Sequence, residues 1–196
     1  RFQADNPEID ILLDSTTRFA DVAHGHADVA LRYTKEVQGD LKVVRFFEDE
    51  TIAVCSPSLI ADKKRPLDIA SMAEFSLLHF DWTQSAQIQL SWQRWVSLVG
   101  GPALPLSGGA RFNDYNAVVQ AAIAGQGIAL VGRPLVNEAL RTGILTEPFG
   151  CSYRNGYGYF AIRAPGDEGR EDNYAEKFVS WVVEESERDK LKRPNP

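Results

Sequence analysis

Hydroxyl, amide and carboxylate side chains gather in two short stretches, residues 14–17 (DSTT) and residues 113–116 (NDYN). Each stretch follows a short apolar run and precedes an amphipathic one, which is the pattern of a strand, a turn and a helix. The first backbone N–H groups of a helix lack partners and favour polar or anionic ligands. The candidate ligand contacts at these turns are therefore Ser15, Thr16, Thr17, Asn113 and Asp114.

The same side chains have an ordinary structural explanation, because Ser, Thr, Asn and Asp are the preferred N-cap residues of helices. Capping alone is about as good an explanation of the first turn as ligand binding. In the second turn a carboxylate at Asp114 would repel an anion, so Asn113 is the better candidate contact.

Three further side chains are candidates for the same ligand. Arg32 ends an apolar run, where a guanidinium can hold a carboxylate through two hydrogen bonds, although a structural salt bridge explains it at least as well. His79 is either a core or hinge histidine or a residue that lines a cleft. Trp82 follows in a loop and can pack on a ligand or on the loop itself.

Metal and catalytic sites find little support in the sequence. His24 and His26 lie two residues apart without a third ligand nearby, which favours surface histidines. The sequence has no G-x-S-x-G, Walker or H-E-x-x-H motif. Residues 125–127 (GQG) follow a predicted helix and precede a strand, the reverse of the dinucleotide-binding order, and indicate a helix stop. We expect no metal, no cofactor and no catalytic residue.

Charge and composition restrict the partners. The chain has 196 residues, 21 Lys and Arg against 27 Asp and Glu, and a formal net charge of −6. The longest basic cluster is residues 63–65, so we expect no DNA binding by this chain itself. No apolar run approaches the roughly 20 residues that span a bilayer. Cys55 and Cys151 cannot form a disulfide framework, which favours a reducing cytoplasm, although a minor redox role stays open.

Short apolar runs alternate with amphipathic stretches along nearly the whole chain, which predicts an α/β protein with parallel sheets. Helices are expected at residues 17–23, 67–75, 91–99, 115–124, 134–141 and 173–187. Strands are expected at residues 9–13, 28–31, 42–47, 51–55, 77–80, 110–112, 128–131, 144–149 and 157–163. The last helix has an apolar stripe of Tyr174, Phe178, Trp181 and Val182.

Residues 9–32 and 110–132 share one plan of strand, polar turn, helix, glycine and strand, so we interpret them as equivalent βαβ units of two Rossmann-like lobes. The chain is expected to cross between the lobes at about residues 51–57 and 157–163, which makes a hinge and an interlobe cleft. We assign residues 1–55 and 160–187 to lobe I, residues 56–159 to lobe II, and residues 188–196 to a frayed tail.

An ordered set of segments resembles the effector-binding domain of LysR-type transcriptional regulators, especially the glycine-cleavage-activator branch. These segments are residues 25–33 (GHADVALRY), 55–59 (CSPSL), 77–79 (LLH), Trp92 with Trp95, and 121–130 (AAIAGQGIAL). The resemblance implies a fold like type II periplasmic binding proteins and a small-molecule effector in the cleft. It adds Tyr33 to the candidate effector contacts, and it strengthens the case for Ser15.

The family further implies homodimers or homotetramers that reposition a separate winged helix-turn-helix on DNA. In such dimers residues 2–13 would pair with residues 91–112 of a partner chain. Against the family pattern the sequence lacks the DNA-binding domain, the linker helix, and the first strand and most of the first helix of lobe I. Residues 2–6 match the end of that helix.

Two other interpretations remain open. A solute-binding protein of a transporter shares the fold and would be distinguished by an export signal in the full gene. A small enzyme on the same scaffold would need paired ionisable groups in the cleft.

Overall fold

The computed structural model describes residues 1–16, 22, 24–81, 91–165 and 173–191, and its backbone contacts divide the chain into two units. The first unit contains the residues up to Glu48 and those from Gly156 onward, and the second contains Asp49–Asn155. The chain therefore crosses between the two units after Glu48 and again after Asn155. Both crossings come earlier in the chain than expected, and the strand that begins at Thr51 pairs within the second unit.

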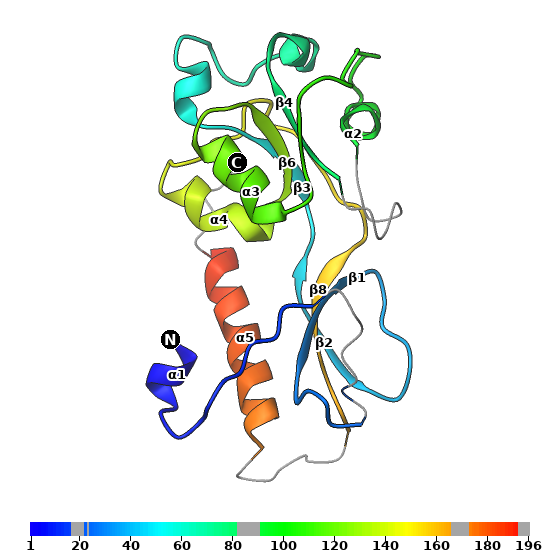
Figure 1. Cartoon of the computed structure of the whole chain (residues 1–196), viewed down its shortest axis with the longest axis vertical. Helices are drawn as coiled ribbons and strands as arrows, with labels where there is room; N and C mark the ends of the chain where they lie inside the picture. The colour runs from blue at the N-terminus through cyan, green and yellow to red at the C-terminus, as the bar shows by residue number, and fades with distance from the viewer. Residues whose placement is uncertain (17–21, 23, 82–90, 166–172, 192–196) are drawn as a thin grey trace. The chain divides into compact units, whose positions relative to one another are not determined.

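The first unit has a three-stranded sheet in the order β1-β8-β2, in which β8 is antiparallel to both neighbours (Figure 1). Its elements are α1 (Phe2–Asp5), β1 (Ala30–Thr34), β2 (Lys42–Glu48), β8 (Gly158–Arg163) and α5 (Tyr174–Leu191). The predicted strands of this unit are thus correct at residues 42–47 and 157–163, and β1 begins two residues later than expected. The parallel pairing predicted here is not found among the described strands.

The helix α5 covers one face of this sheet. Val179 and Val182 pack with Ala161 of β8, and Phe178 and Trp181 lie beside the same cluster. The predicted apolar stripe is confirmed at three positions, but Tyr174 at the start of the helix is 48% exposed. The helix also continues past the expected end at residue 187, as far as Leu191, where a frayed tail was predicted.

Residues 9–13 are not a strand, and this expectation was wrong. Leu12 and Leu13 are 94% and 83% exposed. A strand needs a neighbour to satisfy its backbone N–H and C=O groups, and the described part of the first unit places none beside this segment. The predicted helix at 17–23 lies almost wholly outside the described residues. Because residues 9–13 form no strand, the interpretation of residues 9–32 as a βαβ unit was wrong.

The second unit has a five-stranded sheet in the order β5-β4-β6-β3-β7. The strand β4 (Leu77–Phe80) is parallel to β5 (Ala110–Phe112) and to β6 (Ile128–Gly132), as the alternation of strands and helices predicted. The strand β3 (Thr51–Val54) runs antiparallel to β6 and to β7 (Ser152–Tyr153), a short strand that was not predicted.

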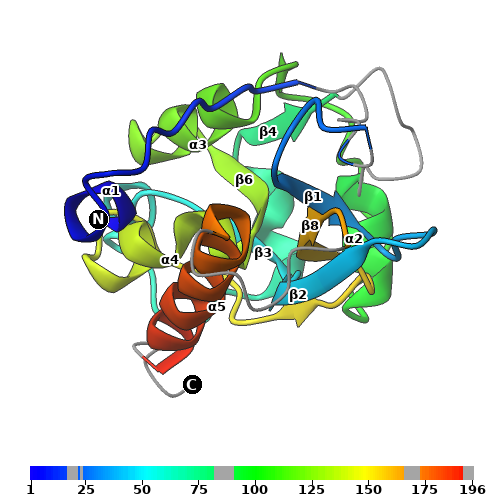
Figure 2. The same ribbon diagram turned by 90° about the horizontal axis from the view of Figure 1, so that it is seen from below.

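Helices cover this sheet at the positions that the sequence indicated. They are α2 (Trp92–Leu98), α3 (Tyr115–Ile123) and α4 (Arg133–Arg141), and α3 lies against β4 and β6 (Figure 1, Figure 2). The short helix predicted at 67–75 is present as a 3₁₀ helix, η2 (Ile69–Glu74), and a second one, η1 (Pro57–Ile60), precedes it. The strand predicted at 144–149 was wrong, because only a single bridge between Cys55 and Thr146 forms there.

The two faces of this sheet carry separate cores, because successive side chains of a strand point to opposite faces. Ala53 packs on the side of α2, whereas Ile52 and Val54 pack on the side of α3 and α4. Trp92 and Trp95 are fully buried in the first of these cores. Their indole N–H groups donate to the carbonyls of Leu78 and Thr51 at 3.1 and 3.2 Å, which confirms a core role for both.

Two glycines let the strands beside β4 approach it closely. A Cβ at Gly109, just before β5, would overlap the carbonyl oxygen of Leu77, and one at Gly127, just before β6, would overlap that of Ser76. Gly125 ends α3 with a φ of +74°, as predicted for the helix stop at residues 125–127. The GQG stretch therefore stops a helix and then brings β6 against β4.

Candidate functional site

Polar side chains follow the parallel strands of the second unit at one edge of the sheet. The carboxyl ends of β4, β5 and β6 lie at the same edge because these strands are parallel. Asp81 follows β4, Asn113 and Asp114 follow β5, and Arg133 follows β6. In open α/β sheets ligands bind beyond the carboxyl ends of the strands. We call these four residues the carboxyl-edge group.

Asn113 and Asp114 have different surroundings. The Oδ1 atom of Asp114 accepts a hydrogen bond from the backbone N–H of Ala117 at 2.8 Å, so Asp114 is the N-cap of α3. The Asn113 side chain is exposed at the same turn. Helix capping therefore explains Asp114, whereas the exposed side chain of Asn113 is accessible to a ligand.

His79 and Arg111 are neighbours in the β4–β5 register and hold the adjacent loop. His79 is 9% exposed, and its Nε2 lies 2.8 Å from the carbonyl oxygen of Gly108, which can only accept, so Nε2 carries the proton. Arg111 Nη1 donates to both carboxylate oxygens of Asp81, at 2.9 and 3.1 Å. His79 is thus largely buried and bound to the backbone, which fits a core histidine better than a residue that lines a cleft.

Tyr115 joins the start of α3 to the end of β6. Its hydroxyl oxygen accepts a hydrogen bond from the backbone N–H of Gly132 at 2.7 Å, and its ring packs edge-on against Phe80 at 5.5 Å. Burial raises the pKa of the Tyr115 hydroxyl, and the hydrogen bond from Gly132 only partly offsets this. Tyr115 therefore stays neutral and fixes the geometry of the edge.

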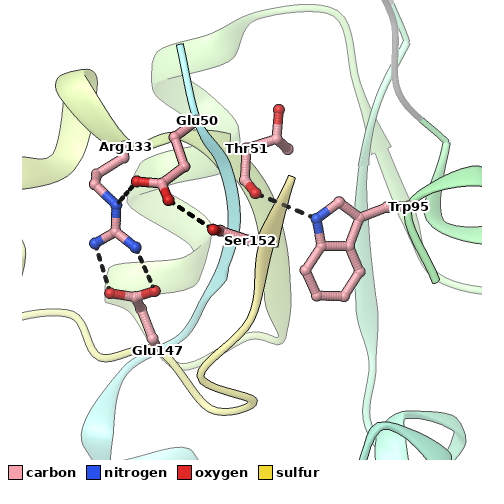
Figure 3. Close-up of polar contacts among 6 residues, drawn as sticks. All are labelled: Glu50, Thr51, Trp95, Arg133, Glu147 and Ser152. Atoms are coloured by element: carbon pink, nitrogen blue, oxygen red, sulfur yellow. Dashed lines mark hydrogen bonds and ion pairs between the residues drawn. The ribbon is translucent and has the colours of Figure 1, made fainter. Parts of the chain in front are cut away.

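Arg133 is held between two carboxylates (Figure 3). Its Nε donates to Glu50, and its Nη1 and Nη2 donate to the two oxygens of Glu147 at 2.7 and 2.8 Å. Ser152 donates to the other oxygen of Glu50 at 2.6 Å. This Arg133 cluster joins the start of β3, the start of α4 and the strand β7.

Charge balance decides what the Arg133 cluster can do. Burial raises the pKa of Glu50, but the hydrogen bond from Ser152 and the charge of Arg133 outweigh it, so the pKa lies below its usual value. Burial lowers the pKa of Arg133, and its two carboxylates more than reverse this. One cation between two carboxylates leaves no charge for an anionic ligand, so the cluster is a structural clamp.

The Arg133 cluster was missed in the sequence. Its members are far apart along the chain and become neighbours only through the β3–β6 and β3–β7 pairings. The available signal was the position of Arg133, directly after an apolar strand and before a helix-starting proline. An adjacent polar pair at this edge is Asn155 and Asp49, in which Nδ2 donates to Oδ2 at 3.0 Å.

The predicted contacts in the first unit do not lie together on one element. Ser15 and Thr16 are exposed and belong to no helix or strand, and Thr17 lies outside the described residues, as does Trp82 of the second unit. Arg32 and Tyr33 are half-buried in β1, opposite Phe160 and Tyr159 of β8. As consecutive strand residues, they point to opposite faces of the sheet.

Aromatic rings surround Tyr33 at the end of the sheet nearest the chain crossings. The rings of Tyr33 and Tyr157 stack with centroids 5.1 Å apart, and Tyr159 lies 5.1 Å from Tyr33. The ammonium of Lys35 lies 5.1 Å from the centroid of the Tyr157 ring. These rings can pack on a planar or apolar part of a ligand, with a cation beside them.

The described residues support neither a metal site nor a reactive thiol. Among the described residues no three His, Cys, Asp or Glu side chains form a group that could hold a metal ion. Burial raises the pKa of Cys55 to about 11, and it also raises the pKa of Cys151. Both side chains therefore stay as unreactive thiols at neutral pH. In the described part of the chain no helix is long and apolar enough to cross a membrane.

Sequence comparison decides the family. The profile of the LysR substrate binding domain matches residues 1–187. The chain belongs to this family. The glycine cleavage system transcriptional activator of Escherichia coli (strain K12) is 28% identical over 148 residues, which are 76% of this chain and 47% of that protein. The transcriptional activator AmpR of Pseudomonas aeruginosa is 27% identical over 158 residues, 78% of this chain and 50% of that protein.

Solved structures of LysR-type effector domains share the fold. The AmpR effector domain of Pseudomonas aeruginosa superposes with a TM-score of 0.69 at 24% identity, covering 97% of this chain and 88% of that one. The regulatory domain of AphB from Vibrio vulnificus gives 0.68 at 20% identity, covering 93% and 86%. The predicted two-lobed, periplasmic-binding-protein-like α/β fold is thereby confirmed. The LysR substrate-binding chain spans about half the length of the curated relatives it matches.

Proposed function

We propose that this chain is the effector-sensing domain of a LysR-type transcriptional regulator that works in the cytoplasm. A small-molecule effector binds it, and a winged helix-turn-helix elsewhere in the longer protein binds DNA. The regulator acts as a homodimer or homotetramer. The observation that carries the proposal is the family match over residues 1–187.

The carboxyl-edge group supports a small polar effector. Asn113 presents an exposed amide beside the start of α3, where helix N–H groups favour negative or polar atoms. The capping bond occupies one oxygen of Asp114, so Asn113 is the proposed contact in the second unit. In the first unit the proposed contacts are Ser15 and Thr16 with either Arg32 or Tyr33, because the last two point to opposite faces of the sheet.

The effector acts by shifting a population. A ligand that binds one arrangement of the domain more tightly than another stabilises that arrangement, and the DNA-binding heads report the shift. The two curated relatives named above are transcriptional activators, which favours this role over that of a solute-binding protein of a transporter. An enzyme is a weaker alternative, because the ionisable groups paired in the Arg133 cluster are committed to one another.

A thermal-shift screen with amino acids, carboxylates and purines tests effector binding, because a bound ligand raises Tm by mass action. For any ligand found, Asn113→Ala should reduce the ligand-induced rise and leave the Tm of the free protein nearly unchanged. Asn116→Ala, in the same polar stretch but already inside α3, is the matched control and should keep the full rise. Equal responses from both variants would remove Asn113 from the site.

A further inference from the structure

Asn155 and Gly156 form one of the two places where the chain crosses between its units. Asn155 ends the stretch that makes up the second unit, and Gly156 begins the return to the first unit, between β7 and β8. Gly156 is exposed and has a φ of +79°, which glycine adopts without strain. A Cβ at Gly156 would meet no atom within 4 Å. The backbone at this crossing is therefore accessible and uncrowded.

An asparagine followed by a glycine can lose its side-chain amide without an enzyme. The backbone nitrogen of the glycine attacks Cγ of the asparagine, and the new N–Cγ bond closes a succinimide ring. The Cγ–Nδ2 bond breaks, and ammonia leaves with the proton of the attacking N–H. Water then opens the ring. Its attack at Cγ gives aspartate, whereas its attack at the backbone carbonyl carbon gives isoaspartate, in which the main chain runs through Cβ and Cγ.

The attacking nitrogen is available at Gly156. Ring closure requires this nitrogen to lose its proton, which is harder when the N–H is held in a hydrogen bond. No described residue accepts a hydrogen bond from the N–H of Gly156. Glycine also places no side chain beside the attacking atom. The sequence contains no other asparagine that is followed by glycine.

The other asparagines of the described chain lack this combination. Asn6 precedes a proline, which has no N–H. Asn113 is exposed, but the side chain of the following Asp114 crowds the attacking nitrogen. The rest lie inside helices or at the start of one, where the regular backbone resists the rotation that ring closure needs: Asn116, Asn137 and Asn173. Asn155 is therefore the favoured position for this reaction.

The side chain of Asn155 also makes a contact that the reaction would remove. Its Nδ2 donates a hydrogen bond to Oδ2 of Asp49 at 3.0 Å, and Asp49 is only 2% exposed. A carboxylate in place of this amide has no proton to donate at neutral pH. Loss of a donor to a buried acceptor is destabilising, because water cannot readily replace the donor. The product should therefore be less stable than the unmodified chain.

We propose that Asn155 is a site of spontaneous deamidation that changes the covalent path of the chain between its two units. Isoaspartate makes the main chain one atom longer at this crossing, and both products lose the hydrogen bond to Asp49. Loop residues between units are the ones that absorb backbone changes when units rearrange. The modification therefore acts on a segment that matters for such a change. The proposal is independent of the proposed effector site.

Incubation of the purified chain at pH 8, followed by digestion and mass spectrometry, tests the site. The peptide that contains Asn155 should gain the mass difference between OH and NH₂ and should separate into an aspartate and an isoaspartate form. This change should be several times faster than at the exposed Asn113, and slower at pH 6, because the attacking nitrogen must lose a proton. Asn155→Gln should suppress it, since the longer side chain closes a ring less readily. A change at Asn155 no faster than at Asn113 would overturn the proposal.

Urea denaturation tests the structural consequence. Asn155→Asp copies one product and should unfold at a lower urea concentration than the natural chain. Asn116→Asp introduces the same charge on an exposed side chain in the first turn of α3, where a negative charge is tolerated, and should not lower the midpoint. The isoaspartate form isolated after incubation should unfold at least as early as Asn155→Asp. Unchanged midpoints for Asn155→Asp and for the isoaspartate form would contradict the proposed effect on the crossing.

Discussion

The guanidinium of Arg133 forms a bidentate pair with the carboxylate of Glu147, in which Nη1 donates to Oε1 at 2.7 Å and Nη2 donates to Oε2 at 2.8 Å. The geometry uses the planar guanidinium fully and leaves Nε for Glu50. Because the Arg133 and Glu50 side chains are each only 19% exposed, the cluster is shielded from solvent more than a surface ion pair.

Removing the cation from this cluster should destabilise the second unit. Arg133→Gln leaves two neighbouring carboxylates without their shared partner, so we expect a loss of about 2–3 kcal/mol in the free energy of unfolding. Urea denaturation followed by the fluorescence of the buried Trp92 and Trp95 measures it. Arg141→Gln, which disturbs an exposed pair with Glu138, should cost less than about 0.5 kcal/mol. A similar loss in both variants would mean that the cluster contributes no more than a surface pair.

The lowered pKa of Glu50 predicts an acid-sensitive contribution to stability. The folded pKa lies below the ordinary 4.5, so the contribution is present above that pH and is lost as the pH falls through the folded value. Unfolding free energies measured between pH 7 and pH 3 should fall less steeply in Glu50→Gln than in the natural chain. Parallel pH curves would show that Glu50 titrates alike in the folded and unfolded chain.

Asp114 should contribute to stability rather than to affinity alone. Asp114→Ala removes the cap of α3 and should cost about 1 kcal/mol, whereas Asp114→Ser keeps a capping oxygen and should cost little. Thermal unfolding of the ligand-free protein compares the two. An alanine variant as stable as the serine variant would contradict the capping role.

Alanine substitutions at the two adjacent glycines before β5 should have very different effects on stability. Gly109→Ala places a Cβ against the carbonyl of Leu77 at a φ of +126°, so we expect a loss of several kcal/mol or failure to fold. Gly108→Ala meets no atom within 4 Å and is the control, with little expected change. Soluble yield and Tm of the two variants give the comparison, and equal values would show that β5 can move away from β4.

Neither thiol should react quickly in the folded chain. With a pKa of about 11, only about one Cys55 side chain in a thousand is a thiolate at pH 8. Modification by a disulfide reagent at pH 8 should be slow until denaturant is added, with Cys151, the more exposed of the two, reacting first. Rapid modification of both in the folded protein would revive the redox alternative.

Local patterns were enough to predict most of the second unit. Its strand at residues 77–80 is apolar except for His79, and its helix at 134–141 has a proline near its start and Gly143 after its end. The strand expected at 144–149 does not form, because only one of its residues, Thr146, pairs with another extended segment of the chain. Register and pairing, which decide such cases, depend on distant residues.

The candidate site was predictable only in part. Asn113 and Asp114 were identified from residue type next to a helix start, which is local information. The partners of Arg133 were not, because Glu50 and Glu147 are brought together by strand pairing. Residues 9–13 are apolar except for Asp10, which fits a strand, but an apolar segment forms a strand only beside a neighbouring strand.

The order of strands in the first unit has a consequence for synthesis on the ribosome. The central strand β8 begins only at Gly158, after the whole second unit, while its partners β1 and β2 are complete by Glu48. At about 5–20 residues per second, these two strands emerge on the order of 10 s before the strand that joins them. The continuous second unit can fold during this interval, so the nascent chain is expected to fold from its middle outward.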